Sequence, residues 1–226
     1  MIYPDQLPAL FADRPNRFIA RVWTEEGKEE VHVKNTGRLK ELLTPGALVT
    51  LTEGKGEGRR TRYDLISVAK PGLGWVNIDS QAPNLLMKEW LEEQGCEVIR
   101  PEYRYGASRL DFYAEMAGEK WLIEVKGCTL EQKGVGYFPD APSERAVKHL
   151  GELAASLQEG YRAAIAFVIP MEGVTEVRAN APQDPAFAKA LALAEIDGVE
   201  VWFLPCQVEA AEVRITDCIV KGRENS

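Results

Sequence analysis

Short runs in which hydrophobic and polar residues alternate follow one another through the first seventy positions of the chain. Alternation with a period of two is the pattern of half-buried β-strands. The polar residues 24–28 are expected to form a hairpin turn, and the glycine-rich residues 53–58 separate two later runs. Several short strands in so few residues predict a small barrel of the OB type. The predicted strands are residues 17–23, 29–34, 47–52 and 60–68.

The pattern changes after residues 70–74, Lys-Pro-Gly-Leu-Gly, which we interpret as a domain boundary. Beyond it, apolar residues recur with helical spacing or form continuous runs, as expected for helices packed on a buried sheet. The expected fold is α/β (α+β), with an OB-like β-barrel at residues 1–74 and an α-β-β-β-α-β domain at residues 75–226. The predicted elements of this second domain are a helix at 83–94, strands at 97–103, 109–116 and 121–125, a helix at 143–157, a strand at 162–169, a helix at 185–196, and strands near 199–204 and 211–220.

Charge is distributed unevenly between these two parts. The whole sequence has 27 basic and 35 acidic residues, a net charge of −8, which argues against nucleic acid because phosphates are bound by Lys and Arg. Residues 1–75 have a net charge of +2, from 12 basic and 10 acidic residues, whereas residues 76–226 have −10, from 15 and 25. The acidity therefore limits nucleic-acid binding without excluding it. No stretch approaches the roughly 18 apolar residues that span a bilayer, so we expect no membrane partner and a cytoplasmic location.

Two carboxylates and a lysine lie on, or directly after, the predicted strands at 109–116 and 121–125. Glu124 and Lys126 are two positions apart and therefore project from the same face. A two-residue turn at Gly118 and Glu119 would place Asp111 opposite Lys126, so that the three side chains converge. The two carboxylates and the main-chain carbonyl of the intervening Val125 suit Mg²⁺ or Mn²⁺ as metal ligands. Such an ion polarises a phosphoryl oxygen, and the lysine beside it can orient the attacking water.

This arrangement resembles the PD-(D/E)xK motif of metal-dependent nucleases, with Leu110 in the place of the proline. The resemblance implies that Asp111, Glu124 and Lys126 are catalytic. The motif is short, and an alternative reading is that the carboxylates form simple ion pairs with Lys126 or Arg109 on a solvated sheet face. The placement on consecutive strands within an α-β-β-β-α-β order favours the nuclease-like interpretation.

A longer resemblance rests on six segments that occur in the same order as in a known family. They are 35–37 (Asn-Thr-Gly), 105–112 (Tyr-Gly-Ala-Ser-Arg-Leu-Asp-Phe), 124–126 (Glu-Val-Lys), 137–141 (Tyr-Phe-Pro-Asp-Ala), 143–145 (Ser-Glu-Arg) and 148–150 (Lys-His-Leu). Over residues 17–201 the chain resembles the family of the bacterial sugar fermentation stimulation protein A. It departs from that family at Val33-Lys34, where a Cys-Pro pair is more usual. The resemblance implies an OB-like domain, a nuclease-like domain, and non-specific DNA binding with a role in regulating maltose metabolism; it leaves catalysis open.

Further polar residues near the motif are candidates for supporting roles. Arg145 and His149 are four positions apart on a predicted helix and share a face, so that together with Lys148 they could contact a scissile phosphate. Asp140 ends a long loop and could approach the metal or cap the following helix. Glu89 could supply an outer metal contact or belong to a solvated acidic face.

Arg59, Arg60 and Arg62 form the densest basic run of the first domain, with Tyr63 adjacent. OB sheets bind single strands by combining basic grooves with stacking aromatic residues. The alternative is an edge strand whose charge prevents aggregation. Two hypotheses follow for the whole chain: a nuclease with weak, salt-sensitive and non-specific DNA binding, or a non-catalytic DNA-binding regulator that retains the nuclease-like fold. RNA remains an alternative nucleic acid.

Overall fold

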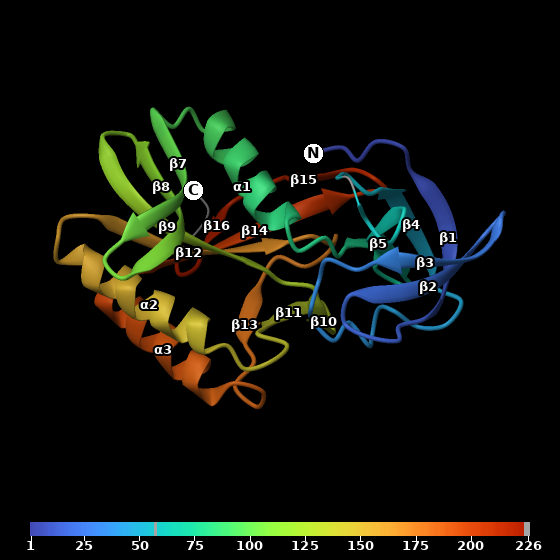
Figure 1. Ribbon diagram of the computed structural model, residues 1–226. Coiled ribbons are helices and arrows are strands. Elements are labelled where there is room, and N and C mark those ends of the chain that lie inside the picture. Colours follow the sequence, from blue (N-terminus) through green and yellow to red (C-terminus); the bar gives the residue numbers. More distant parts are fainter. Residues whose placement is uncertain (57, 224–226) are drawn as a thin grey trace.

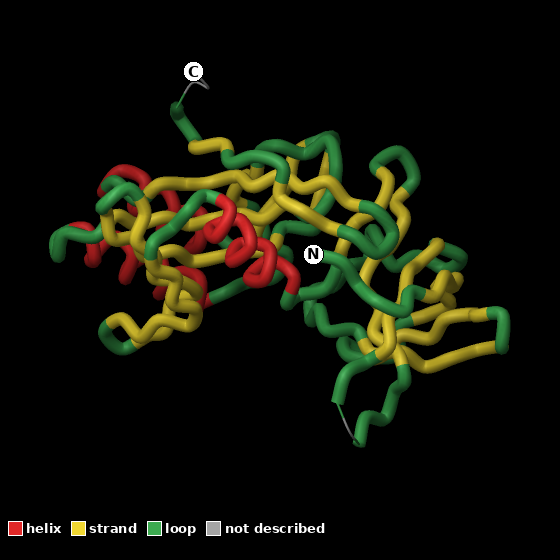
Figure 2. Tube along the Cα trace, turned by 90° about the horizontal axis from the view of Figure 1, so that it is seen from above, coloured by secondary structure: helices red, strands yellow, loops and turns green. Residues whose placement is uncertain are grey.

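The computed structural model describes residues 1–56 and 58–223. It confirms the mixed α/β architecture, with a β-barrel formed by the N-terminal third and a sheet flanked by helices after it (Figure 1, Figure 2). Within the described residues, no helix is long and apolar enough to cross a membrane.

Five strands form the barrel in the order β3-β2-β1-β4-β5, and neighbours in this order are antiparallel. The ring closes with a parallel pairing, between His32 of β3 and Asp64 of β5. Ala20 and Val22 are fully buried while their neighbours along the strand are more exposed, so the alternation seen in the sequence separates the inside of the barrel from its outside. The strands of this sheet are β1 (Leu7–Asp13), β2 (Ile19–Thr24), β3 (Gly27–His32), β4 (Leu48–Glu53), β5 (Tyr63–Lys70) and β6 (Gly74–Asn77).

Residues 70–74, the predicted domain boundary, form the turn between β5 and β6. Lys70 pairs with Gly74 across this turn, and Gly74 has a φ of 91°, in the left-handed region that favours glycine. Because β6 extends the sheet of the barrel, we propose that the first domain continues through Ile78 and that the second begins near the following helix.

The second domain is built on a sheet with the strand order β15-β14-β12-β9-β8-β7. Strands β7, β8 and β9 form an antiparallel meander, whereas β12 lies parallel to both β9 and β14. The β-β-β-α-β order expected from the sequence is therefore present. It places β8, which carries Asp111, and β9, which carries Glu124 and Lys126, next to the centre of the sheet. The strands are β7 (Val98–Tyr105), β8 (Ser108–Met116), β9 (Glu119–Gly127), β12 (Arg162–Ile169), β14 (Glu200–Val208) and β15 (Val213–Ile215), with β16 (Ile219–Val220) also paired to β14.

Helix α1 (Ala82–Glu93) covers one face of this sheet, and α2 (Glu144–Leu157) and α3 (Pro185–Asp197) cover the other (Figure 1). After Arg162, strand β12 is apolar and buried on both of its faces. Ala166 belongs to the core cluster that contains Leu86 of α1. Phe167 belongs to the cluster that contains Leu150 of α2 and Phe187 of α3.

Three stretches differ from the predicted elements. Strand β1, which contains Pro8, was not among the predicted strands. Residues 127–141 were expected to be a loop, but they contain the hairpin of β10 (Leu130–Gln132) and β11 (Val135–Phe138), which pairs with β13 (Val177–Ala179). The last predicted strand, at 211–220, is divided into β15 and β16.

Candidate functional site

Asp111, Glu124 and Lys126 come together on β8 and β9, in a register that differs from the predicted one. The β8–β9 ladder runs from Met116 paired with Glu119 to Phe112 paired with Ile123. Extending this register would set Asp111 opposite Glu124, whereas the predicted register set it opposite Lys126. The difference is two residues. Because side chains alternate between faces with a period of two, a two-residue shift leaves every side chain on its predicted face.

The Asp111 carboxylate is held by two donors from different elements. Its Oδ2 accepts the main-chain N–H of Val125 at 2.8 Å, and its Oδ1 accepts the side-chain amide of Asn84 at 3.0 Å. Asp111 is only 9% exposed. Asn84 lies in the first turn of α1, whose N-cap is Gln81, so the start of this helix positions the carboxylate.

Glu124 is buried almost completely, at 1% exposure, and its two carboxylate oxygens have different surroundings. Oε1 accepts a hydrogen bond from the Lys126 ammonium and lies 2.6 Å from Nδ1 of His149. Oε2 is also buried and has no hydrogen-bond partner among the described residues. A buried charged oxygen without a partner is costly, so this atom is the natural place for a bound ligand.

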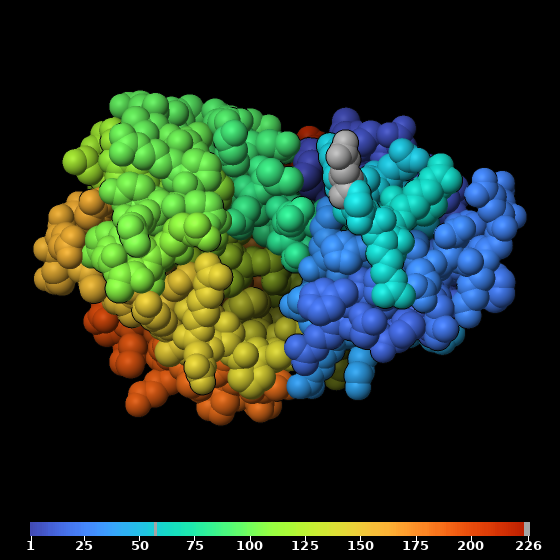
Figure 3. Space-filling model, viewed as in Figure 1, coloured from blue at the N-terminus to red at the C-terminus, as the bar shows by residue number. Residues whose placement is uncertain are grey.

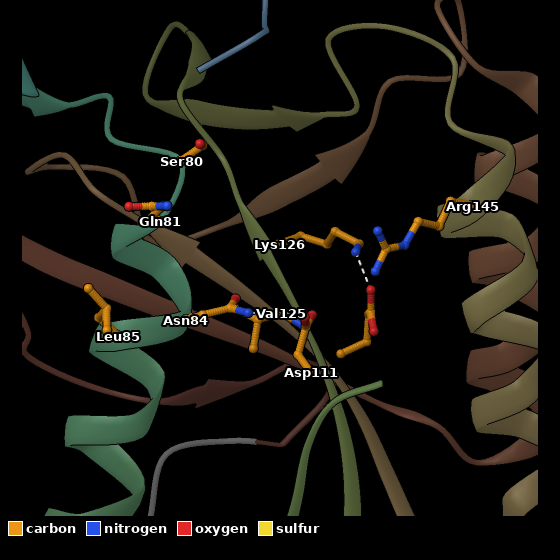
Figure 4. Close-up of a pocket in the computed structure, with 9 residues that line it drawn as sticks. Ser80, Gln81, Asn84, Leu85, Asp111, Val125, Lys126 and Arg145 are labelled. Atoms are coloured by element: carbon orange, nitrogen blue, oxygen red, sulfur yellow. Dashed lines mark hydrogen bonds and ion pairs between the residues drawn. The ribbon is translucent and has the colours of Figure 1, made fainter. Parts of the chain in front are cut away.

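These groups line a cavity of about 640 Å³, which we call the Asp111 cavity. It lies between the start of α1, the paired strands β8 and β9, and the start of α2. In Figure 4, the Lys126 and Arg145 side chains extend toward one another from β9 and α2. The lining residues are Ser80, Gln81, Asn84, Leu85, Asp111, Glu124, Val125, Lys126 and Arg145.

The oxygen atoms available in the Asp111 cavity fit a hard divalent cation as metal ligands. Asp111 and Glu124 carry carboxylate oxygens, and Val125, which donates its main-chain N–H to Asp111, lines the same cavity. Mg²⁺ typically binds through one or two carboxylates and retains several waters. Within residues 1–56 and 58–223, no group of three or more His, Cys, Asp or Glu side chains forms a metal cluster. With two carboxylates in the Asp111 cavity, an ion bound there would complete its coordination with water or substrate.

Of the three predicted phosphate contacts on α2, only Arg145 lines the Asp111 cavity. Lys148 forms an ion pair with Glu152 at 3.7 Å. His149 is 3% exposed and faces Glu124. A signal for this burial was present in the sequence, since His149 precedes the buried Leu150 on the apolar face of the helix. The structure nevertheless brings the three residues together, because Arg145, Lys148 and His149 all line a neighbouring cavity of about 470 Å³.

The two candidate accessory carboxylates lie outside the Asp111 cavity. Oδ2 of Asp140 accepts the main-chain N–H of Arg38 at 3.0 Å. Glu89 pairs with the N-terminal amine of Met1 at 3.0 Å. In place of these two, Asn84 is the neighbour that binds Asp111.

The basic run at residues 59–62 is largely neutralised within the barrel. Each of its three arginines forms an ion pair with a carboxylate from another position of the first domain. Arg62 also stacks over the ring of Tyr63, 4.9 Å from its centroid. The partners are Asp64 for Arg59, Glu30 for Arg60 and Glu53 for Arg62.

Comparisons with known proteins cover nearly the whole chain. The family described as "SfsA N-terminal OB domain" matches residues 13–78, and the "Sugar fermentation stimulation protein RE domain" matches residues 81–212. Two sugar fermentation stimulation protein homologs, from Ruminiclostridium cellulolyticum and Desulfitobacterium hafniense, are each 45% identical; the matches cover 95% and 97% of this chain and 96% and 97% of theirs. The structure of Pyrococcus furiosus SfsA in complex with Ca²⁺ has a TM-score of 0.82 and 31% identity, over 98% of this chain and 96% of that one.

Proposed function

Because the chain belongs to the sugar fermentation stimulation protein family, we propose that it is a DNA-binding protein whose Asp111 cavity is a metal-dependent phosphodiesterase site. The single observation that carries the proposal is the buried, unpartnered Oε2 of Glu124 in a cavity that also contains Asp111 and Lys126. Two carboxylates beside a lysine and an arginine, in one concave site, form a combination suited to phosphoryl chemistry.

Asp111, Glu124 and the main-chain carbonyl of Val125 would hold Mg²⁺ or Mn²⁺. The P. furiosus relative forms a complex with Ca²⁺, another divalent ion that prefers oxygen ligands, which supports a cation of this class. When bound, the ion would polarise a phosphoryl oxygen and lower the pKa of a bound water.

The chain's own side chains have separate tasks in this proposal. Asn84 fixes Asp111, while His149 and Lys126 both engage Oε1 of Glu124 and leave Oε2 free. The Lys126 ammonium orients the attacking water and stabilises the negative charge that develops on the phosphate. Arg145 contacts a phosphate oxygen from the opposite wall of the cavity.

The proposed ligand is DNA bound without sequence preference, since contacts to phosphates carry no sequence information. Binding would be weak because the chain as a whole is acidic, with a net charge of −8. It would decrease with salt because cationic side chains that contact phosphates release counterions. RNA is a second candidate substrate. The proposed link to the regulation of sugar metabolism follows the description of the family.

The test is cleavage of end-labelled single- and double-stranded DNA and RNA in Mg²⁺ or Mn²⁺, compared with EDTA. Asp111→Asn and Lys126→Met are expected to abolish cleavage. Glu119→Gln is the matched control. Glu119 is the first residue of β9, the strand that also carries Lys126, but it forms an ion pair with Arg162 outside the cavity. If wild type cleaves none of these substrates while Asp111→Asn retains DNA as wild type does, the catalytic proposal is overturned in favour of a non-catalytic DNA-binding regulator.

A further inference from the structure

A second cavity, of about 500 Å³, lies between the barrel and the segment that precedes α2. Four of its ten lining residues are basic and one is acidic. We call it the basic cavity. Concave sites with an excess of one charge concentrate ligands of the opposite charge. The charged residues are Arg14, Arg17, Arg38, Lys40 and Asp140.

Arg14 gives the basic cavity a defined shape. Its guanidinium donates to the main-chain carbonyls of Arg17 at 2.7 Å, Asn35 at 2.6 Å and Gly37 at 2.8 Å. These bonds tie the turn before β2 to the segment after β3. Nε of Arg14 is buried and has no hydrogen-bond partner among the described residues. The site is therefore organised in advance and retains an unused, buried donor.

The positive charges of the basic cavity are not neutralised by the protein. In the described part of the chain, Arg17, Arg38 and Lys40 form no ion pair with a carboxylate, in contrast to the arginines of residues 59–62. Burial lowers the pKa of Arg14 below its ordinary value, and the nearby charge of Arg17 adds to this effect, while Asp140 opposes it. An anion placed here would offset the repulsion between Arg14 and Arg17, as Asp140 does in part.

The basic cavity and the Asp111 cavity are joined by short segments on two sides. On the barrel side, the hydroxyl of Ser80, which lines the Asp111 cavity, donates to the carbonyl of Lys34 at 3.1 Å, and from Lys34 the chain runs directly into the basic cavity. On the other side, Pro142 lines the basic cavity, and Arg145, three residues later, lines the Asp111 cavity. Figure 3 shows the surface hollowed between the blue barrel and the yellow segment that contains the start of α2.

We propose that the basic cavity binds the phosphodiester backbone of a nucleic acid whose scissile phosphate lies in the Asp111 cavity. This inference rests on the proposed function and specifies where the substrate runs. It assigns backbone binding to Arg17, Arg38 and Lys40, and not to the arginines of residues 59–62. Guanidinium groups suit this role because their planar donors match phosphate oxygens.

The test is the salt dependence of binding, measured in EDTA so that no metal-dependent cleavage occurs, with labelled single-stranded and duplex DNA. The variant Arg17→Ala/Arg38→Ala/Lys40→Ala removes three exposed side chains and leaves Arg14 in place to hold the backbone. Three lost phosphate contacts should reduce the slope of log K against log salt by about 2.7 for duplex DNA. Between about 50 and 200 mM salt, wild type should therefore lose about 40-fold more affinity than the variant.

The matched control is Lys28→Ala/Arg60→Ala/Arg62→Ala, which removes the same charge from the same barrel. Its three cations are paired with Asp13, Glu30 and Glu53, so a slope close to that of wild type is expected. Equal reductions in both triple variants would show an effect of net charge alone and overturn the inference. Thermal melting confirms folding, and Arg17→Gln/Arg38→Gln repeats the test with smaller changes of side-chain volume.

The outcomes separate this inference from the proposed function. If the basic-cavity variant binds DNA with the wild-type slope while Asp111→Asn abolishes cleavage, the inference is wrong and the proposed function stands. If wild type binds neither form of DNA at any salt concentration, the DNA-binding function is overturned, and the inference with it.

Discussion

Replacing Asp111 by asparagine should abolish the stabilisation of the fold by Mn²⁺ and leave the metal-free protein about as stable as wild type. Asparagine has nearly the same shape, so its Oδ1 can still accept the N–H of Val125, which is 2.8 Å from the carboxylate in the wild type. Asn84 can present its amide oxygen to the new amide by rotating its side-chain amide group. The change therefore removes a metal-binding charge and preserves the hydrogen bonds.

The expected size of the effect follows from linkage. A ligand that binds only the folded state stabilises it by about 2.7 kcal/mol when its concentration is 100 times Kd. For a chain of this size, 1 kcal/mol shifts Tm by about 2–4 °C, so wild type should gain about 5–11 °C in saturating Mn²⁺. Asp111→Ala behaves differently in EDTA, because it leaves the buried N–H of Val125 without a partner, at a cost of about 1–3 kcal/mol.

The assay is thermal unfolding, followed by tryptophan fluorescence, in EDTA and at increasing Mn²⁺. Wild type and Glu119→Gln should show the same rise of Tm, while Asp111→Asn and Asp111→Ala should show none. If Mn²⁺ stabilises Asp111→Asn as much as wild type, metal ligation by Asp111 is refuted. Because this readout needs no substrate, it tests the metal site separately from cleavage.

Three further substitutions test the surroundings of the site. Gly127→Ala should destabilise the protein by about 1–3 kcal/mol in urea unfolding, because its Cβ would lie 2.7 Å from Cγ of Pro83, at the start of α1. Gly151→Ala is its counterpart on α2: its Cβ would meet nothing within 4 Å, so a gain of up to about 1 kcal/mol is expected in the same assay. The ion pair with Lys70 lowers the pKa of Glu131 below its ordinary 4.5. The stabilisation by Glu131 is therefore complete above that pH and is lost as pH falls through the lower folded pKa, so the Tm difference between wild type and Glu131→Gln should disappear in acid. These expectations would be contradicted if Gly151→Ala lowered the free energy of unfolding, or if Gly127→Ala left it unchanged. A Tm difference for Glu131→Gln that persists in strong acid would also contradict them.

The convergence of Asp111, Glu124 and Lys126 could be predicted from sequence even though the register was wrong. Periodicity of two determines which face a side chain occupies, and an error of two residues in a turn does not change that face. The helices of the second domain could also be located from their local signals. Ser143, for example, is the N-cap of α2 and accepts the main-chain N–H of Ala146 at 3.3 Å, as its residue type predicts.

Strand β1 could not be predicted locally, because its tolerance of proline depends on its neighbours. Pro8 pairs with Thr50 of β4, but pairing with β2 begins only at Leu10. At Pro8 the strand therefore has an unpaired side, as an edge strand does, and a residue without an N–H is acceptable there. The pairing of the whole barrel determines which side of a strand is unpaired. A local stretch of about ten residues carries no information on this pairing.

The positions of the cations illustrate the same limit for function. Arg59, Arg60 and Arg62 are close together in sequence, yet carboxylates from β3, β4 and β5 neutralise them. The cations of the basic cavity are distributed over residues 14–40, and the fold brings them together where Arg14 binds the carbonyls of a second segment. A phosphate responds to the charge that remains after ion pairing, and not to the local density of arginines. For this protein, the basic cavity is therefore the better candidate for binding the DNA backbone than the arginines of residues 59–62. The two triple variants distinguish these two surfaces.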